Sequence, residues 1–296
     1  MCAILLGPAD NSPYRTHAQV RLTGPFPSVQ ADARLCRVTP EKSPLVLLHG
    51  ILMSGNGWQD VVPLLSDQHR VHSFTTAGHR GGSPAPPRPA TVSDLVDDAE
   101  RYLDAHGLER PHVVGLSLGG WMAIELARRG RAATVCAFAP AGFWSSGDSA
   151  QAHVLKQIHK FVAIGRVARP LRPMVAVAMK SATVRRLGLR DAACHADRIT
   201  TAQSVSAIDD MIGCTVDVDD FLGSGEQIAP LDPLPCPVTI AWSGNDAIVP
   251  VPLCDPIARR RVPQASFTTL PGVGHVPMVD DPALVARTIL TVTGAR

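Results

Sequence analysis

The sequence predicts an α/β protein with a mostly parallel, twisted sheet that is flanked by helices and interrupted by one helical segment. From residue 45 to residue 140, apolar stretches of strand length alternate with stretches of helical periodicity. Strands that are apolar without interruption are buried on both faces, which is typical of parallel sheets covered by helices. Residues 143–230 break the alternation, and the strand pattern returns at residue 236.

Composition and charge exclude several classes of protein. The chain has 296 residues, of which 45% are hydrophobic and 18% are charged, enough for one large α/β domain with an insertion or for two small domains. The formal net charge of +2 is too small to indicate nucleic-acid binding. The seven cysteines are scattered without a C-x-x-C pair, so we expect reduced thiols in a cytoplasmic protein. No apolar run reaches the ~18–20 residues of a membrane span, and we expect neither export nor membrane insertion.

The first elements follow from local patterns. Short alternating segments at 18–22 and 33–38 predict edge strands, which we expect to be antiparallel. The apolar run 45–50 ends in His-Gly and predicts a central strand. We expect a helix within 58–65, interrupted or begun near Pro63, and another strand at 71–76.

The following elements repeat a strand–helix rhythm. Thr91 and Asp94 have the spacing of a capping box, and the apolar positions after them predict a helix that Gly107 closes. We then expect a strand that ends just before Ser117, a buried helix over 118–129 and a strand over 133–140. Strands over 236–244 and 265–271 and a helix over 283–290, with Pro282 at its start, complete the prediction.

The interrupting segment predicts a helical cap. We expect the core to consist of residues 1–142 and 231–296, with the cap inserted at 143–230. Residues 151–190 contain nine Lys or Arg and no acid, whereas residues 191–230 contain eight acids and one Arg. We interpret these halves as attracting each other. The alternative is that the basic half recognises an anionic ligand or a membrane surface.

Three residue types that are used together in nucleophilic catalysis each follow a predicted strand. Ser117 stands between Gly115 and Gly119 at a strand-to-helix turn, where larger side chains would collide with the neighbouring backbone. Asp246 and His275 follow the last two predicted strands. Because parallel strands end at one edge of the sheet, we expect all three to meet there. An imidazole can take the serine proton, and a carboxylate can fix the imidazole tautomer.

The chain order Ser, Asp, His and five motifs resemble the α/β-hydrolase fold superfamily, in particular its cap-bearing serine hydrolases. The motifs are Leu47-Leu-His-Gly50, Gly78-His-Arg-Gly-Gly-Ser83, Gly115-Leu-Ser-Leu-Gly119, Ser243-Gly-Asn-Asp246-Ala-Ile-Val-Pro250 and Gly274-His-Val-Pro-Met-Val-Asp-Asp-Pro282. The resemblance implies an α/β-hydrolase fold in which Ser117 is the nucleophile, His275 the base and Asp246 the orienting acid. Asp148, the acid nearest to the strand that ends at Pro140, is a weaker alternative to Asp246.

The same resemblance assigns an oxyanion hole. It implies one backbone N–H donor from Leu118 and a second from Ile51, with Leu52 as the alternative to Ile51. It also implies that His49 orders this loop without being catalytic. Removing one donor of this kind typically costs about 100- to 1000-fold in rate.

The resemblance implies a hydrolase that cleaves a carboxylic ester, or a related acyl bond, of a small and mostly apolar substrate through an acyl-enzyme. Serine at position 117 argues against haloalkane dehalogenases and epoxide hydrolases of this family, which use aspartate. Three alternatives stay open: a C–C bond hydrolase, a cofactor-free haloperoxidase-like enzyme, or a non-catalytic ligand-binding protein. Against the first, Val276 stands where C–C hydrolases usually have an aromatic residue.

The cap, which carries no motif of its own, is expected to supply the substrate pocket. The apolar candidates for its lining, each equally compatible with plain core packing, are Trp121, Phe143, Trp144, Met174 and Met179. No cluster has the spacing of metal ligands, so we expect neither a metal nor a cofactor. The expected partner is a small acyl substrate and not nucleic acid, and the expected state is a monomer or homodimer.

Overall fold

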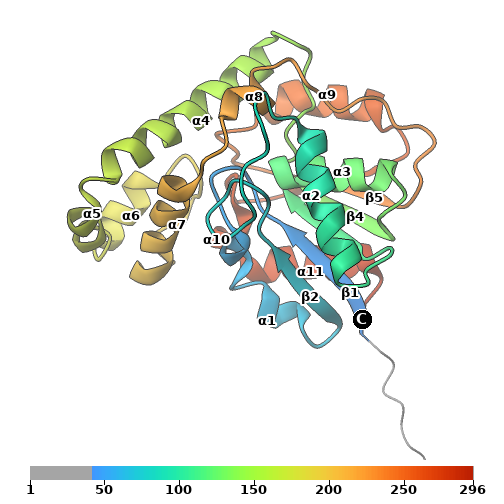
Figure 1. Ribbon diagram of the computed structural model, residues 1–296. Coiled ribbons are helices and arrows are strands. Elements are labelled where there is room, and N and C mark those ends of the chain that lie inside the picture. Colours follow the sequence, from blue (N-terminus) through green and yellow to red (C-terminus); the bar gives the residue numbers. More distant parts are fainter. Residues whose placement is uncertain (1–41, 296) are drawn as a thin grey trace, which may run out of the picture. The chain divides into compact units, whose positions relative to one another are not determined.

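The computed structural model describes residues 42–295 and contains a six-stranded parallel sheet (Figure 1). The strand order is β2-β1-β3-β4-β5-β6. The strands are β1 (Ser43–Leu48), β2 (His69–Phe74), β3 (His112–Leu116), β4 (Thr134–Phe138), β5 (Val238–Ser243) and β6 (Ser266–Leu270). The predicted fold class is therefore confirmed, whereas the edge strands predicted at 18–22 and 33–38 lie outside the described residues.

The strand register brings the carboxyl ends of the strands to one edge of the sheet. Leu116, the last residue of β3, pairs with Phe138, the last residue of β4. Ser243, the last residue of β5, pairs with Leu270, the last residue of β6. The segments that follow these strands therefore start side by side, which is the arrangement that parallel strands impose on a ligand site.

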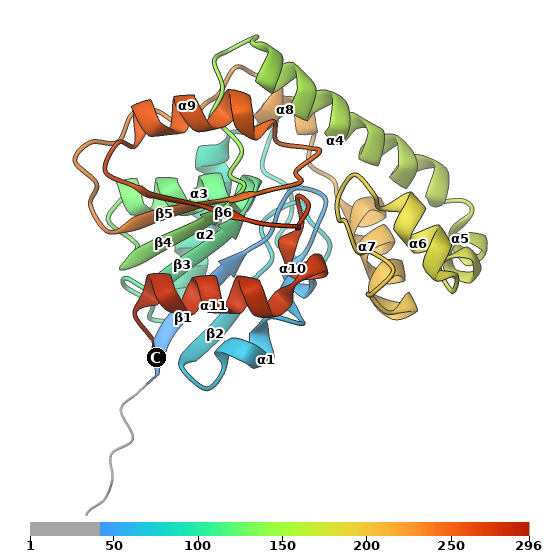
Figure 2. The same cartoon turned by 180° about the vertical axis from the view of Figure 1, so that it is seen from behind.

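Two layers of helices cover the sheet because successive strand residues point to opposite faces. In β1, Val46 and Leu48 belong to the core under α2 (Val92–Ala105), α3 (Leu118–Arg128) and α9 (Val251–Arg261). Leu45 and Leu47 belong to the opposite core, with η1 (Gly55–Trp58), α1 (Val62–Leu65), α10 (Pro277–Asp280) and α11 (Pro282–Thr293). Figure 1 shows α2 in front of the sheet, and Figure 2 shows α11 in front of its other face.

Some helix boundaries follow the prediction and others do not. The Thr91 side chain accepts from the N–H of Asp94, and the Asp94 side chain accepts from the N–H of Thr91, so the predicted capping box is present. The helix expected within 58–65 is instead two short turns, η1 and α1. The helix α9 was not predicted, and its Pro252 and Pro256 lack the N–H of a regular helical residue.

Five helices lie between β4 and β5 in the chain, as the helical patterns of this segment predict. They are α4 (Ser149–Ala168), α5 (Arg172–Ala178), α6 (Ala182–Gly188), α7 (Thr201–Gly213) and α8 (Val218–Leu222). We call residues Ser149–Leu222 the helical insertion. The long helix α4 contacts α7 and α8, and α5 contacts α7. In both views α5 and α6 lie farthest from the strands (Figures 1 and 2).

Ion pairs link the basic and acidic halves of the insertion. Lys160 pairs with Asp191, and Arg172 pairs with Asp209 at 2.8 Å. The expected attraction between the halves is thus present in these ion pairs. Other acids of the second half bind loops outside the insertion.

Asp220 is the clearest example of such a link to the core. Its carboxylate accepts from Arg88 at 3.0 Å and 3.2 Å and from the N–H of Ala90 at 3.1 Å. The acidic half therefore also fastens the insertion to the segment that precedes α2.

Within residues 42–295, no helix combines the length and apolar character that crossing a bilayer requires. The cysteines in these residues are free, and they are Cys136, Cys194, Cys214, Cys236 and Cys254. Cys2 and Cys36 lie outside the described residues.

Candidate active site

Ser117 lies at the turn between β3 and α3 in a strained backbone conformation. Its φ is 53° and its ψ is −113°, a region that residues with a side chain rarely adopt. Its N–H donates to the carbonyl of Phe138 at 2.9 Å, and its carbonyl accepts from Trp121 at 3.0 Å and Ala141 at 3.1 Å. These bonds to β4, to α3 and to the segment after β4 hold the strained turn in place.

Two glycines make this turn possible. A Cβ atom at Gly115 would lie 2.0 Å from the carbonyl oxygen of Gly119. A Cβ atom at Gly119 would lie 2.5 Å from the carbonyl oxygen of Leu48. Both distances are far below van der Waals contact, so the steric reason inferred from the sequence applies on both sides of Ser117.

His275 and Asp246 form a buried pair after β6 and β5. Nδ1 of His275 is 2.8 Å from Oδ2 of Asp246, and both side chains are almost fully buried. The other carboxylate oxygen of Asp246 accepts from the N–H groups of Ile248 and Val249, each at 2.8 Å. The carboxylate is therefore fixed on both oxygens, and the imidazole presents its Nε2 edge away from Asp246.

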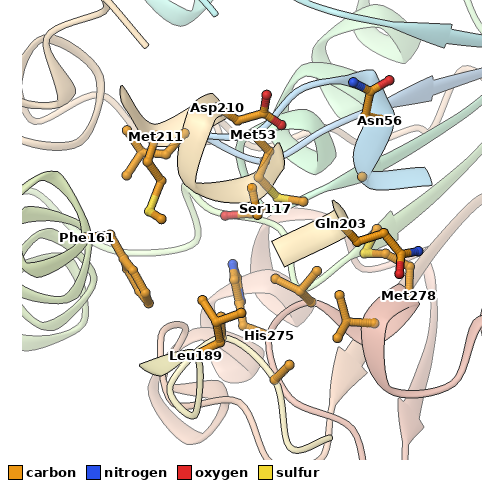
Figure 3. A pocket seen from close by; sticks show the side chains of 18 of the residues that line it. Met53, Asn56, Ser117, Phe161, Leu189, Gln203, Asp210, Met211, His275 and Met278 are labelled. Atoms are coloured by element: carbon orange, nitrogen blue, oxygen red, sulfur yellow. The ribbon is translucent and has the colours of Figure 1, made fainter. Parts of the chain in front are cut away.

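Ser117 and His275 line the same cavity. Figure 3 shows a ring nitrogen of His275 directed toward Ser117. The walls are mostly apolar and come from the core loops and from the insertion. Representative apolar lining residues are Met53, Phe161, Leu189, Ile199, Met211 and Met278, and polar ones are Asn56, Gln203, Ser206 and Asp210. Such a cavity fits a small molecule with an apolar body.

The loop after β1 forms another wall of this cavity and is held by His49. The Nε2 atom of His49 accepts from the N–H of Thr76 at 3.1 Å, so the neutral ring carries its proton on Nδ1. Nδ1 then donates to the carbonyl of Gly50 at 2.8 Å. The backbone of Leu52 in the same loop has a φ of 63°. His49 thus orders this loop from behind, as the resemblance implies.

The two expected oxyanion donors have free backbone N–H groups. Among the turn and loop backbone bonds of residues 42–295, neither the N–H of Ile51 nor that of Leu118 donates to a carbonyl. Leu118 is the first residue of α3, and the N–H at that position has no intrahelical acceptor. Ile51 and Leu52 both line the cavity.

A family model described as the alpha/beta hydrolase family matches residues 45–288. The chain belongs to the α/β-hydrolase family. The match runs from β1 into α11 and includes the segments that carry Ser117, Asp246 and His275.

Curated relatives within the family have different reported activities. The epoxide hydrolase EphH of Mycobacterium tuberculosis is 32% identical over 200 residues, which cover 66% of this chain and 91% of that protein. The 3-oxoadipate enol-lactonase 1 of Acinetobacter baylyi is 31% identical over 122 residues, 40% of this chain and 45% of that protein. Family membership establishes a hydrolase, whereas the substrate class differs between these relatives.

Solved structures agree on the fold. A thermophilic esterase from Thermogutta terrifontis has a TM-score of 0.60 at 21% identity, covering 85% of this chain and 89% of that one. The carboxylesterase CesB (YbfK) of Bacillus subtilis has a TM-score of 0.63 at 17% identity, covering 86% and 84%. At this level of identity the likeness concerns the fold alone.

Two buried histidines lie behind the loop that follows β1. The ring centroids of His49 and His79 are 4.9 Å apart in an edge-to-face arrangement. Burial, followed by the repulsion of His79, lowers the pKa of His49 from 6.5 to about 3. Burial also lowers the pKa of His79 to about 4, against its hydrogen bonds to the backbone of Ala77 and Thr76. Both rings are therefore neutral at pH 7, in agreement with the donor assignment of His49.

Asp210 joins the insertion to two loops of the core. The carboxylate lies on α7 at the cavity and is 4% exposed. It accepts from the Ser54 hydroxyl at 2.7 Å and from Nε of Arg80 at 2.7 Å. Burial raises its pKa, although both bonds act in the opposite direction. Because Ser54 follows β1 and Arg80 follows β2, Asp210 positions α7 over the site.

Asp280 holds the loop that carries His275. Its buried carboxylate accepts from the N–H groups of Gly274 at 2.7 Å, Cys194 at 3.0 Å and His195 at 2.6 Å. Gly274 directly precedes His275 in the chain, whereas Cys194 and His195 belong to the insertion. Asp280 thus ties His275 to the insertion. This role was not predicted from the sequence, although Asp280 stands within the motif that contains His275.

The structure places none of the five apolar lining candidates at the cavity that contains Ser117. Trp121, Phe143 and Trp144 are buried in the core beside α3 and β5. Met179 packs in a small cluster with Ala168 and Ile208, and Met174 is 69% exposed. These five residues were wrong candidates because aromatic and methionine side chains fill the apolar space of a core and of a ligand cavity alike. Residue type therefore does not distinguish the two locations.

The described residues also bear on metal binding. Within residues 42–295, no three His, Cys, Asp or Glu side chains gather in a group that would hold a metal ion.

Proposed function

We propose that the chain is a serine hydrolase that cleaves a carboxylic ester, or a related acyl bond, of a small and mostly apolar substrate. The observation that carries the proposal is the 2.8 Å pair between His275 and Asp246 beside a cavity that also contains Ser117. In this proposal the three residues act as a catalytic triad. The mostly apolar lining supports the substrate class.

The reaction would proceed in two steps. Nε2 of His275 takes the Ser117 proton while Oγ attacks the acyl carbon, and His275 then returns the proton to the leaving alcohol. Asp246 keeps the proton on Nδ1 and stabilises the imidazolium. The N–H groups of Leu118 and Ile51, or Leu52, would stabilise the negative oxygen. Water activated by His275 then hydrolyses the acyl-enzyme.

We propose that residues 143–230 act as the cap and decide which acyl group fits. Phe161, Leu189 and Met211 come from this segment and line the cavity. Asp210 and Asp280 would keep the cap aligned with the core, since each bonds to both parts.

Epoxide opening is a second candidate because one relative carries that name. Attack of Ser117 on an epoxide carbon would form an ether, which contains no carbonyl carbon for water to attack. Attack on an acyl carbon instead forms an ester, which the same imidazole and a water molecule can hydrolyse. Serine at the nucleophile position therefore favours acyl chemistry.

Labelling with a fluorophosphonate tests the nucleophile. We expect covalent labelling at pH 7 that the Ser117→Ala variant abolishes. The matched control is Ser206→Ala, which removes a second hydroxyl from the same cavity and should leave labelling in place. Absence of Ser117-dependent labelling would contradict the proposal and favour a ligand-binding protein.

A substrate panel tests the reaction class. We expect hydrolysis of p-nitrophenyl esters, with a preference for one range of acyl chain lengths set by the cavity. A ring-cleavage dienone represents C–C bond hydrolysis, monochlorodimedone halogenation represents haloperoxidase activity, and styrene oxide represents epoxide opening. Turnover of any of these three without ester hydrolysis would refute the ester assignment.

A further inference from the structure

We propose that α5, α6 and the end of α4 form a docking surface for an anionic lipid bilayer. The surface is defined by six exposed apolar side chains, Val167, Leu171, Met174, Val177, Val184 and Leu187. They are six of the eight large exposed hydrophobic residues within residues 42–295, although they come from a stretch of 21 positions. This concentration distinguishes the surface from the scattered apolar residues of an ordinary protein exterior.

Both faces of α5 are apolar, which is unusual for a helix at the periphery. Its inner side chains, Val175 and Met179 at the following cap, pack in a cluster with α7. Its outer side chains Met174 and Val177 are 69% and 63% exposed. A helix that is apolar on all sides is normally buried, so the outer face is suited to a further apolar partner.

Basic residues belong to the same segment of the chain as this apolar surface. Between residues 149 and 190 the chain has no Asp or Glu. Arg166, Lys180 and Arg186 are exposed, and none of them forms an ion pair with a residue in 42–295. Exposed apolar side chains combined with exposed cations that form no ion pair are the pattern of segments that lie in the interface of anionic membranes.

Charge selects the bilayer among the occupants of such a surface. A second copy of the chain would place the same cations opposite each other. Residues 1–41 contain four Arg and three acidic residues, so they supply no excess of negative charge. A nucleic acid would leave the apolar side chains without an apolar partner. An anionic bilayer offers both negative headgroups and acyl chains.

The docking surface adjoins the cavity. Leu187 lies on the surface, and Leu189, two residues later, lines the cavity with Ser117. Arg185 ties α6 to the segments before and after it by donating to the carbonyls of Met179 and Asp197 at 2.8 Å and 3.0 Å. Docking would therefore bring the cavity wall next to the lipid phase. The docking itself needs neither Ser117 nor any acyl chemistry.

Vesicle flotation with the full chain tests the proposal. We expect binding to vesicles of phosphatidylcholine with 30 mol% phosphatidylglycerol that is at least tenfold tighter than to pure phosphatidylcholine. The binding should weaken when NaCl rises from 50 mM to 500 mM. Equal binding to both vesicle types, or no binding to either, would overturn the proposal.

Two variants and a matched control locate the surface. The Arg166→Gln/Lys180→Gln/Arg186→Gln variant should lose about 100-fold in affinity for the anionic vesicles, at about fivefold for each cation. The Met174→Gln/Val177→Gln/Leu187→Gln variant should lose at least tenfold. The control Leu253→Gln/Arg260→Gln replaces one exposed apolar and one exposed basic side chain on α9 and should bind as the unchanged chain does. An equal loss in the control would overturn the location.

Two further measurements separate the alternatives. Ser117→Ala should bind vesicles fully, so a failure of the proposed function would leave this result standing. All variants should keep the thermal transition of the unchanged chain, since the replaced side chains are exposed. A dimer in light scattering that the apolar variant abolishes, together with absent vesicle binding, would assign the surface to a second copy and refute lipid docking.

Discussion

Acidification from pH 7 to pH 5 is expected to destabilise the fold through two buried imidazoles. Folding lowers the pKa of His49 from 6.5 to about 3 and that of His79 to about 4. Between these values and 6.5, the unfolded chain binds protons that the folded chain does not. The free energy of unfolding is therefore unaffected above pH 6.5 and falls as the pH drops below it.

The magnitude follows from the proton linkage. Each pH unit below 6.5 lowers the free energy of unfolding by about 1.4 kcal/mol for each imidazole that stays neutral in the folded state. Down to pH 5 this amounts to about 2 kcal/mol for His49 and about 2 kcal/mol for His79, or about 4 kcal/mol together. Burial also lowers the pKa of His69, His72 and His112, which adds to the effect in the same direction.

Urea unfolding at pH 7, 6 and 5, followed by tryptophan fluorescence, measures this dependence. The His79→Asn variant places an amide donor where Nδ1 faces the carbonyl of Ala77 at 3.1 Å, but it removes the titration. We expect the loss of stability between pH 7 and pH 5 to shrink by about 2 kcal/mol in this variant. The control is His106→Gln, which removes an exposed imidazole. Parallel pH dependences for His79→Asn and the unchanged chain would refute the reasoning.

Three further substitutions test the contacts around the site. Gly119→Ala should lower ester hydrolysis at least 100-fold and destabilise the fold, because its Cβ would lie 2.5 Å from the Leu48 carbonyl oxygen; a fully active variant would contradict the steric argument. Asp280→Asn should lower the free energy of unfolding in urea by about 2 kcal/mol and lower kcat at least tenfold, because an amide has one acceptor oxygen for three N–H groups. An unchanged kcat would show that Asp280 does not position His275. Arg80→Gln should cost about 1–2 kcal/mol by leaving the Asp210 carboxylate buried without its cation, and Arg190→Gln, which removes an exposed cation whose partner Asp191 also pairs with Lys160, should change thermal unfolding little.

Local patterns predicted the parts of the fold that depend on neighbouring residues. The unbroken apolar runs predicted buried parallel strands, because a strand that is covered by helices on both faces has apolar side chains on both. The capping box at Thr91 and Asp94 involves residues three apart and was predictable for the same reason. The steric demand at Gly115 and Gly119 also followed from their spacing around Ser117.

These local patterns did not predict the contacts between segments that are distant in the chain. Trp121, Phe143 and Trp144 were candidates for the cavity because they are apolar, but they fill the core. The helix α9 was missed because its prolines oppose helix formation locally, whereas packing of its buried residues Cys254 and Ala258 against the sheet supports it. In each case the outcome was decided by the burial of apolar surface against another segment.

The sequence by itself determined the alternation of strands and helices, the turn around Ser117 and the order in which Ser117, Asp246 and His275 follow their strands. These features rest on interactions within a few residues and on the common direction of parallel strands. The tertiary structure alone decided that His275 meets Asp246 at 2.8 Å and that Asp280 ties this loop to the insertion. It also decided which side chains line the cavity, because that depends on how segments far apart in the chain pack against one another.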